Sequence, residues 1–512
     1  MFQGSNTGKD KNSTIDWSPY AFVAFLSGAA YFVVSRLGSI WAHSIDLALH
    51  CVLVARLMTG EHIADVDPTM GEMTHYPRIS HTIAAVVGAL GDSPILGLHI
   101  TSLVSLIALW GLIAWAMTGS GKLSSALLVI FLILMLLNGL FFHVEIFGNE
   151  IIGNYFFPQL VSQALAVLVL VLAGRFEKSG VPAEIRYVFL ALSVPALASV
   201  HLIPALEVAG VLTLSIISEC YASWRLRQAA AGVFALLLDA LLTAKNADFW
   251  MMVTLSEING AIYIRYIRGA GGVVVLAIGT FIISAAILYR WTQSDPARRT
   301  DRLFMKYLAC FGVACAGLCI AQYLMLSLFG KGSEYAGKKY GFGLDTTLFL
   351  MAVYAVAIAL PKSVVERLDR RLVPLACVAA VPLLFVVSPQ FKIRHAIDAD
   401  RLVNVERLLR HYRDVALEPR ANTSDYAVGI SGVDGIGNYL LSIVSLHAPR
   451  LPNAITIISG EPLPKPDQVG FIFTSENSRP WDVPTCRRHI FPNSIVQLDG
   501  SCVVAARAPP VQ

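Results

Sequence analysis

Long apolar runs without a charged side chain recur along the first three quarters of this 512-residue chain. A helix needs about 20 largely apolar residues to cross the hydrocarbon core of a bilayer. Because backbone groups in lipid must be hydrogen-bonded within their own segment, we expect each run to be a transmembrane helix. The longest runs are Trp17–Ser35, Ser93–Gly121, Leu123–Phe142, Ile151–Gly174, Gly269–Tyr289, Tyr307–Gly330 and Leu372–Phe391.

Weaker segments complete the predicted bundle. Thr346–Pro361 is shorter, and Ala229–Ala244 carries one internal acid. Ala183–Ser218 contains two prolines and a histidine, and it is too long for one helix but short for two full spans. We therefore predict two half-length helices that turn near Ser199–Pro204, which keeps His201 away from the outer surface in a structural role. The expected fold is mainly α, a polytopic bundle of about eleven helices, two of them short.

The distribution of basic residues predicts the orientation in the membrane. With the N-terminus inside, the inner connections hold 17 Lys and Arg residues and the outer connections hold nine. Inner connections of membrane proteins are richer in Lys and Arg, so we expect a cytoplasmic N-terminus and an extracytoplasmic C-terminus in a bacterial inner membrane. The net charge of +4 gives no indication of a nucleic-acid partner. Membrane lipids are expected partners.

Residues 392–512 differ in composition from the transmembrane part, residues 1–391. They are polar, with short β-like runs such as Val469–Phe473 and an amphipathic helix near Asp398–Asp414. We predict a small soluble α/β domain outside the membrane. Cys486 and Cys502 are the cysteines of this segment. Two cysteines in an oxidising compartment indicate a disulfide, and two unpaired thiols are the alternative.

The segment after the first membrane helix is far longer than a turn. It contains two short runs, near residues 45–58 and 79–90, which are too short to span and are predicted to lie on the outer membrane surface. The acid-rich stretch between them includes Asp65 and Asp67. Two carboxylates at this spacing can share a divalent cation such as Mg²⁺ or Mn²⁺ with a phosphate. A turn or helix cap is the alternative.

Two motifs in this segment carry a resemblance to a known family. An acidic residue, Asp46, opens the first surface run, which ends in an arginine and a glycine. The second run begins within the sequence that leads from His75 and Tyr76 to His81. This order resembles the GT-C superfamily of membrane glycosyltransferases, whose members often carry two adjacent acids where this chain has Ile45 before Asp46. The resemblance implies a GT-C type bundle that transfers a sugar from a polyprenyl-phosphate carrier at the outer face.

The resemblance also implies roles for charged residues in three outer segments. Asp46 is expected to be the catalytic base, with a helix N-terminal acid as the alternative. Glu145 or Glu150 is expected to supply a second acid, with a solvated loop acid as the alternative. Lys338 or Lys339 is expected to contact the donor phosphate, with contact to lipid head groups as the alternative.

Other residues are expected to bind substrate around these groups. His75, Tyr76 and His81 can orient acceptor or donor, and Tyr335 precedes Lys338 by three residues, as in several GT-C subfamilies. Arg265 lies in an outer segment rich in aromatic residues, which suits contact with lipid phosphates or plain interfacial anchoring.

The predicted function is therefore an inverting transfer of a sugar from a polyprenyl-phosphate donor to an outer-face glycan, lipid or protein acceptor. Three alternatives stay open on the sequence. They are a transporter or flippase of a lipid or solute, a glycan polymerase or ligase that uses a lipid pyrophosphate, and an assembly subunit without catalysis. Transporters often contain internal repeats, and no repeat is evident here.

Overall fold

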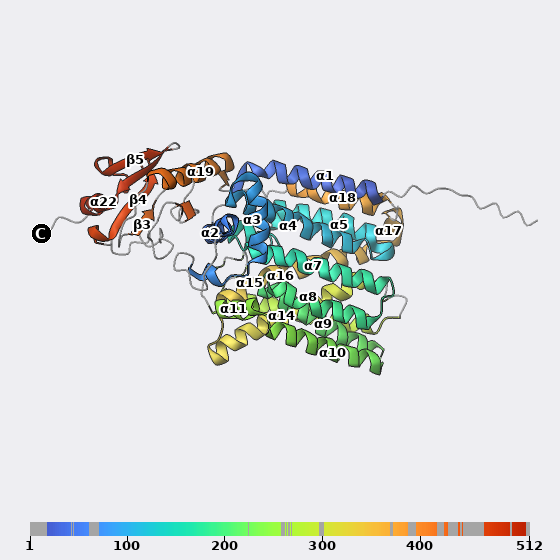
Figure 1. Ribbon diagram of the computed structural model, residues 1–512. Coiled ribbons are helices and arrows are strands. Elements are labelled where there is room, and N and C mark those ends of the chain that lie inside the picture. The colour runs from blue at the N-terminus through green and yellow to red at the C-terminus, as the bar shows by residue number, and fades with distance from the viewer. Residues whose placement is uncertain are drawn as a thin grey trace, which may run out of the picture.

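The apolar runs of the sequence lie in long helices that run side by side, and the polar tail forms a smaller unit beyond one end of them (Figure 1). The structure is a computed structural model. It describes residues 18–41, 44, 46–60, 71–223, 225–257, 262, 264, 267, 269–295, 299, 302–368, 372–387, 396–416, 424–428, 439–440, 443, 465–491 and 494–507.

All eleven segments predicted to be membrane helices are helical. In the described part of the chain, nine helices are long and apolar enough to cross a membrane, or ten if α17 (Lys362–Leu368) and α18 form one bent span. The eleven predicted segments correspond to the following helices, of which α8 is not among the nine and α18 counts only together with α17: α1 (Ser18–Leu37), α4 (Pro94–Met117), α5 (Ser124–Leu137), α7 (Phe157–Lys178), α8 (Ala183–Ala198), α9 (Leu202–Ala222), α10 (Leu226–Ala244), α12 (Gly269–Thr292), α14 (Leu303–Phe329), α16 (Gly341–Ala359) and α18 (Leu372–Val387).

The prediction of two half-length helices is wrong for the second of them. Helix α8 has 16 residues, but α9 has 21, which at about 1.5 Å per residue reaches across the hydrocarbon core. The turn between them is therefore at one end of the bundle. Asn246, just after α10, fixes the turn there, because its Nδ2 donates to the carbonyl of Pro195 at 2.8 Å and to Oγ of Ser199 at 3.0 Å.

Two further boundaries differ from the sequence prediction. The run that begins at Ile151 is broken, because α6 (Asn149–Gly153) ends before Tyr155, whose φ of 58° is incompatible with a continuing helix. Residues 331–345 form a short helix, α15 (Glu334–Lys339), and the start of α16 instead of a loop. Ser333 caps α15 by accepting a hydrogen bond from the backbone N–H of Ala336 at 3.1 Å.

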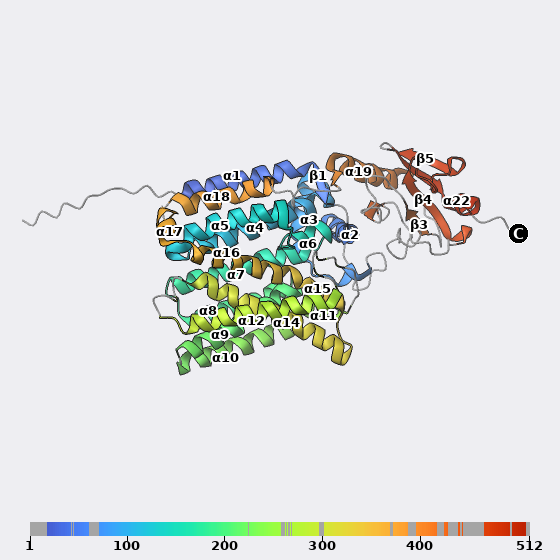
Figure 2. The ribbon, with the colours of Figure 1, turned by 180° about the vertical axis from the view of Figure 1, so that it is seen from behind.

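The two short helices expected after α1 are α2 (Asp46–Thr59) and α3 (Ile79–Gly91), with the 3₁₀ turn η1 (Gly71–His75) between them. Both views place α2, α3 and α11 (Ala247–Leu255) at one end of the bundle, the α2 end, while α17 lies at the other, the α17 end (Figure 2). A Cβ on Gly97 of α4 would lie 2.1 Å from the carbonyl oxygen of Ala84, so glycine lets α3 approach α4. Val86 and Leu90 of α3 are exposed, as a helix in the membrane surface requires.

The tail is attached to the α2 end by contacts that the sequence did not predict. Strand β1 (Ser39–Trp41), directly after α1, pairs antiparallel with β2 (Ala396–Asp398). Helix α19 (Ala399–Ala416) then docks on the junction of α3 and α4. Its buried Glu406 accepts a hydrogen bond from Oγ of Ser93 at 2.6 Å, and Nη1 of Arg410 lies 3.0 Å from the carboxylate of Asp92.

The rest of the described tail is a four-stranded sheet. Its order is β3-β4-β6-β5, with β3 parallel to β4 and the other pairs antiparallel. Cys486 and Cys502 form a disulfide with Cα atoms 5.6 Å apart, which joins the segment before β5 to the last helix. The elements are β3 (Ser424–Ala427), β4 (Val469–Ser475), β5 (Arg487–Phe491), β6 (Ile495–Asp499) and α22 (Gly500–Arg507).

Candidate active-site cavity

A cavity of about 1820 Å³, including its open mouth, lies at the α2 end. Four of the residues predicted to act on substrate line it together: Asp46, Tyr76, Tyr335 and Lys339. They come from three separate segments of the chain, α2, the residue after η1, and α15, so the fold brings together what the sequence predicted only one motif at a time. Most other described lining residues are apolar or aromatic, and they include Leu49, Met73, Phe156, Leu202, Ile203, Leu206, Met252, Val253, Leu255 and Met325.

Asp46 reaches the cavity from the N-terminus of α2. It is the first residue of the helix, and its backbone N–H donates to Oγ of Ser44 at 3.2 Å. The partial positive charge at a helix N-terminus favours a carboxylate there. Asp46 is therefore compatible with both sequence interpretations. Its carboxylate is stabilised by the helix N-terminus, and the same residue lines the cavity.

Lys339 is held between two aromatic rings at the C-terminus of α15. Its Nζ lies 4.5 Å from the ring centre of Phe156 and 4.3 Å from that of Tyr335. Such contacts attract an ammonium group and fix its place. The helix itself is anchored by Ser333, whose Oγ donates to the carbonyl of Ser256 at 2.9 Å. An ammonium group is therefore positioned at the wall of a largely apolar cavity.

The structure separates the two adjacent lysines that the sequence left as alternatives. Nζ of Lys338 lies 2.6 Å from the carboxylate of Glu334, one helical turn away, and Lys338 is absent from the cavity lining. Since consecutive helical residues point about 100° apart, one of the two faces the cavity and the other does not. Of this pair, Lys339 is the one placed to meet a ligand.

His50, which lines the cavity, forms a hydrogen bond with His81, which does not. Nδ1 of His81 lies 3.1 Å from the carbonyl oxygen of Pro77, which can only accept, so this nitrogen carries the proton. Nε2 of His81 must then accept from Nδ1 of His50, 2.9 Å away. The remaining nitrogen of His50, Nε2, is an acceptor, and His50 lines the cavity. His81 itself is absent from the cavity lining, and its direct contact with substrate stays a prediction.

Burial keeps the histidines around the cavity neutral. It lowers the pKa of His81 to about 3. Burial, His81 and the positive charge of Lys339 lower the pKa of His50 well below its usual range. His201 has its pKa lowered by burial and by Lys339 as well. Apart from tyrosines, the other titratable side chains of the described lining are those of Asp46, Glu257, Lys331 and Lys339.

His201 lines the cavity, contrary to the prediction that it lies away from the outer segments. It is the N-cap of α9, where its Nδ1 accepts from the backbone N–H of Ile203 at 3.3 Å. The prediction failed because full-length α9 brings the turn to the α2 end. Gln159, near the start of α7, is a second lining residue that the sequence analysis missed. The sequence signal for this turn was the pair of prolines on either side of His201. Prolines are compatible with a turn in the middle of the membrane as well as with one at the end of the bundle.

Glu145 and Glu150 are absent from the cavity lining. Their loop folds into the bundle, where the backbone N–H of Phe147 donates to Oγ1 of Thr346 at 2.8 Å. Glu150 is fully buried and accepts from the N–H of Gly148 at 2.6 Å. Burial raises the pKa of Glu150 to about 7. A solvated loop acid is therefore the wrong description of Glu150, and the predicted second acid does not reach the cavity.

The remaining predicted residues are either absent from the cavity lining or outside the described residues. His75 ends η1 with an exposed side chain and is absent from the lining. Asp65, Asp67 and Arg265 lie outside the described residues. Within the part of the chain that is described, no group of three His, Cys, Asp or Glu side chains is arranged to hold a metal ion. The divalent-cation site at Asp65 and Asp67 stays a prediction.

Comparison with known proteins gives one structural match to report. No family model and no curated protein matches the sequence. A solved structure described as ArnT from Cupriavidus metallidurans bound to undecaprenyl phosphate aligns with 95% of this chain and 98% of its own. The alignment has 11% sequence identity and a TM-score of 0.45. The function is therefore inferred from the residues of this chain and their arrangement.

Proposed function

We propose that this protein is a membrane glycosyltransferase that moves a sugar from a polyprenyl-phosphate carrier to an acceptor at the membrane surface. The observation that carries the proposal is the shared cavity of Asp46 and Lys339 at the α2 end of a transmembrane bundle. Such a reaction needs a cation on the leaving phosphate and a base on the acceptor, and both must lie at the water–lipid boundary.

Lys339 is the group that we assign to the donor phosphate. As the bond from the anomeric carbon to the phosphate oxygen breaks, negative charge grows on that phosphate. An ammonium group fixed by Phe156 and Tyr335 stabilises this charge without having to reorganise. The apolar lining residues from α9, α11 and α14, such as Leu206, suit the prenyl chain next to the phosphate.

Asp46 is the group that we assign to the acceptor. It takes the proton from the acceptor hydroxyl as the acceptor oxygen bonds to the anomeric carbon, and polyprenyl phosphate leaves from the opposite side. This single displacement inverts the anomeric centre. The unprotonated Nε2 of His50 can accept a further hydroxyl hydrogen bond, with His81 fixing the tautomer. His50 then orients the acceptor, and His81 is a positioning residue.

The proposal is tested by following transfer from a polyprenyl-phosphate sugar to added acceptors with the full-length protein in lipid vesicles. We expect Asp46→Asn to retain donor binding and to lose turnover, since the base is replaced by an isosteric amide. Glu257→Gln is the matched control, because Glu257 lines the same cavity with a half-exposed side chain. Equal turnover in Asp46→Asn and the wild type would refute the assignment.

The same vesicles distinguish the transporter alternative. If the wild-type protein moves labelled carrier lipid between leaflets while no acceptor gains a sugar, the transporter function is favoured instead. A glycan ligase is distinguished by its donor, because it would use a lipid pyrophosphate and release a pyrophosphate carrier. A set of mono- and pyrophosphate donors in parallel reactions therefore separates the three functions.

A further inference from the structure

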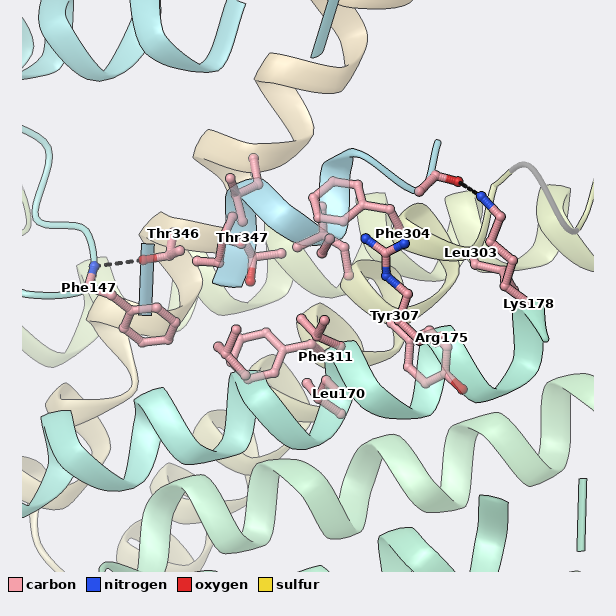
Figure 3. A pocket seen from close by; sticks show the side chains of 18 residues that line it. Phe147, Leu170, Arg175, Lys178, Leu303, Phe304, Tyr307, Phe311, Thr346 and Thr347 are labelled. Carbon is pink, nitrogen blue, oxygen red and sulfur yellow. Dashed lines mark hydrogen bonds between the residues drawn. The ribbon is translucent and has the colours of Figure 1, made fainter. Parts of the chain in front are cut away.

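A second cavity lies in the half of the bundle near the α17 end and is separate from the proposed active site. It has a volume of about 830 Å³, including its open mouth, and is lined mainly by α4, α7, α14 and α16. Figure 3 shows the labelled side chains of Phe147 and Thr346 at one end of it and those of Arg175 and Lys178 at the other. The walls between are apolar or aromatic, and they include Ile113, Val167, Leu170, Phe304, Phe311 and Leu350.

The dimensions of this cavity match one leaflet of a bilayer. Along α7 its lining runs from Val167 to Lys178, which at about 1.5 Å per residue is about 16 Å. The hydrocarbon core of a bilayer is about 30 Å thick, so one leaflet contributes about 15 Å. The cavity therefore accommodates a single acyl chain that enters from one membrane surface, with its polar end at Arg175 and Lys178.

The two cations at this end have no acid to balance them among the described residues. Glu177, which lies between them in sequence, is committed elsewhere, because its carboxylate lies 2.7 Å from Nζ of Lys306 and also pairs with Arg186. No described carboxylate forms an ion pair with Arg175 or Lys178. An anionic group from outside the chain therefore fits the charge of this end.

Both cations are also held in place for such a group. Nη2 of Arg175 donates to the carbonyl of Trp115 and to Oγ1 of Thr118, each at 2.8 Å, and its guanidinium lies over the Trp115 ring. Lys178 donates to the carbonyl of Gly119 at 3.0 Å. These hydrogen bonds cap the end of α4. They use only one of the three guanidinium nitrogens of Arg175 and only one N–H of the Lys178 ammonium group. N–H groups of both side chains remain for a phosphate.

We propose that this cavity binds an anionic phospholipid, with one acyl chain between α7 and α14 and the phosphate at Arg175 and Lys178. The basic-residue distribution of the sequence assigns this end to the cytoplasmic leaflet, where basic pockets between helices bind anionic head groups. The proposal is independent of the glycosyltransferase function, since no residue of this cavity lines the one that contains Asp46.

Native mass spectrometry of the delipidated, full-length protein tests it. The protein is titrated with phosphatidylglycerol and, separately, with phosphatidylethanolamine of the same chains. We expect tight binding of one phosphatidylglycerol, and the double variant Arg175→Gln/Lys178→Gln should lower its affinity by about one order of magnitude. The charge-matched control is Arg225→Gln/Arg290→Gln, which removes two exposed cations near the same end without touching the cavity. The control should bind as the wild type does.

A second variant tests the cavity independently of its charges. Gly174 lines the space, and a Cβ there meets the Tyr307 ring at an unstrained 3.6 Å, so Gly174→Leu should fold and fill the cavity. We expect it to lose the tightly bound lipid while both cations remain. Unchanged phosphatidylglycerol binding in either variant would overturn the proposal. Displacement of the lipid from the wild type by equimolar polyprenyl phosphate would also overturn it, by assigning the cavity to the carrier.

Discussion

Replacing Lys339 by methionine tests the centre of the proposed mechanism with little disturbance of the fold. Methionine keeps an unbranched apolar side chain between Phe156 and Tyr335 and removes the ammonium group alone. The adjacent Lys338 offers a matched control, because Lys338→Met removes the same charge from the same short helix but outside the cavity. A difference between the two variants therefore reports on the position of the charge.

The size of the expected effect follows from the contact that is lost. A hydrogen bond between an ammonium group and a phosphate contributes about 1.5–3 kcal/mol, so Lys339→Met should weaken donor binding about 10- to 150-fold. The loss should be larger in turnover than in binding, because charge on the leaving phosphate increases in the transition state. Lys338→Met removes an ion pair with a half-exposed glutamate one helical turn away, worth about 0.5 kcal/mol or less.

Two measurements on the same preparations give the answer. Binding of a fluorescent polyprenyl phosphate is titrated in detergent, and sugar transfer is followed at saturating donor. We expect weak binding and slow transfer for Lys339→Met, and wild-type values within about threefold for Lys338→Met. Equal losses in both variants would mean that only the net charge of α15 matters, and this would refute the assignment of Lys339 to the donor phosphate.

Three further predictions follow from the described contacts. Asp46→Asn should lower kcat by about 10²–10⁴ with little change in donor binding, as measured by initial rates of transfer. His81 has a folded pKa of about 3 and an unfolded pKa near 6.5, so only the unfolded chain gains this proton and stability falls as pH drops below about 6.5. His81→Gln should therefore remove about 2 kcal/mol of the stability loss between pH 7 and pH 5, so the unfolding temperature of the variant should fall less than that of the wild type over this range. Glu219→Gln removes a buried carboxylate that pairs with Arg186 and Lys306, so it should lower the free energy of thermal unfolding by about 3–5 kcal/mol. Glu184→Gln removes a more exposed ion pair and should lower it by less than about 1 kcal/mol.

The helices were predictable because their sequence signal is local. A run of about 20 apolar residues can satisfy its backbone in lipid only as a helix, whatever its neighbours do. The same reasoning fails at the run that begins at Ile151. The residues from Ile151 to Phe156 are as apolar as those of α7, but the left-handed backbone of Tyr155 separates them from it. Hydropathy does not register such a break.

The pairing of side chains across helices was not predictable, because it depends on how the helices pack. Glu177, Arg186, Glu219 and Lys306 each lie near the end of an apolar run, where a charge is usually solvated. In the structure they form a buried network: Lys306 is fully buried and lies 2.7 Å from Glu177, and Arg186 lies 3.0 Å from Glu219. The network forms only when the ends of four separate helices pack together. The spacing of charged residues along the sequence does not predict that packing.

This network fixes the α17 end of the bundle, and other contacts fix the short helix that carries Lys339 at the α2 end. It joins α7, α8, α9 and α14 near the α17 end, where breaking any buried pair is costly. Lys339, by contrast, belongs to a six-residue helix that follows Gly330 and Gly332, both with positive φ. Even so, Sγ of Cys319 in α14 donates to the carbonyl of Gly337 in α15 at 3.7 Å, so α15 is held against one of the four long helices. The place of the Lys339 ammonium group at the cavity wall is therefore fixed through α14 and through the carbonyl of Ser256, which accepts from Ser333, so a ligand that enters the cavity meets this group already in position.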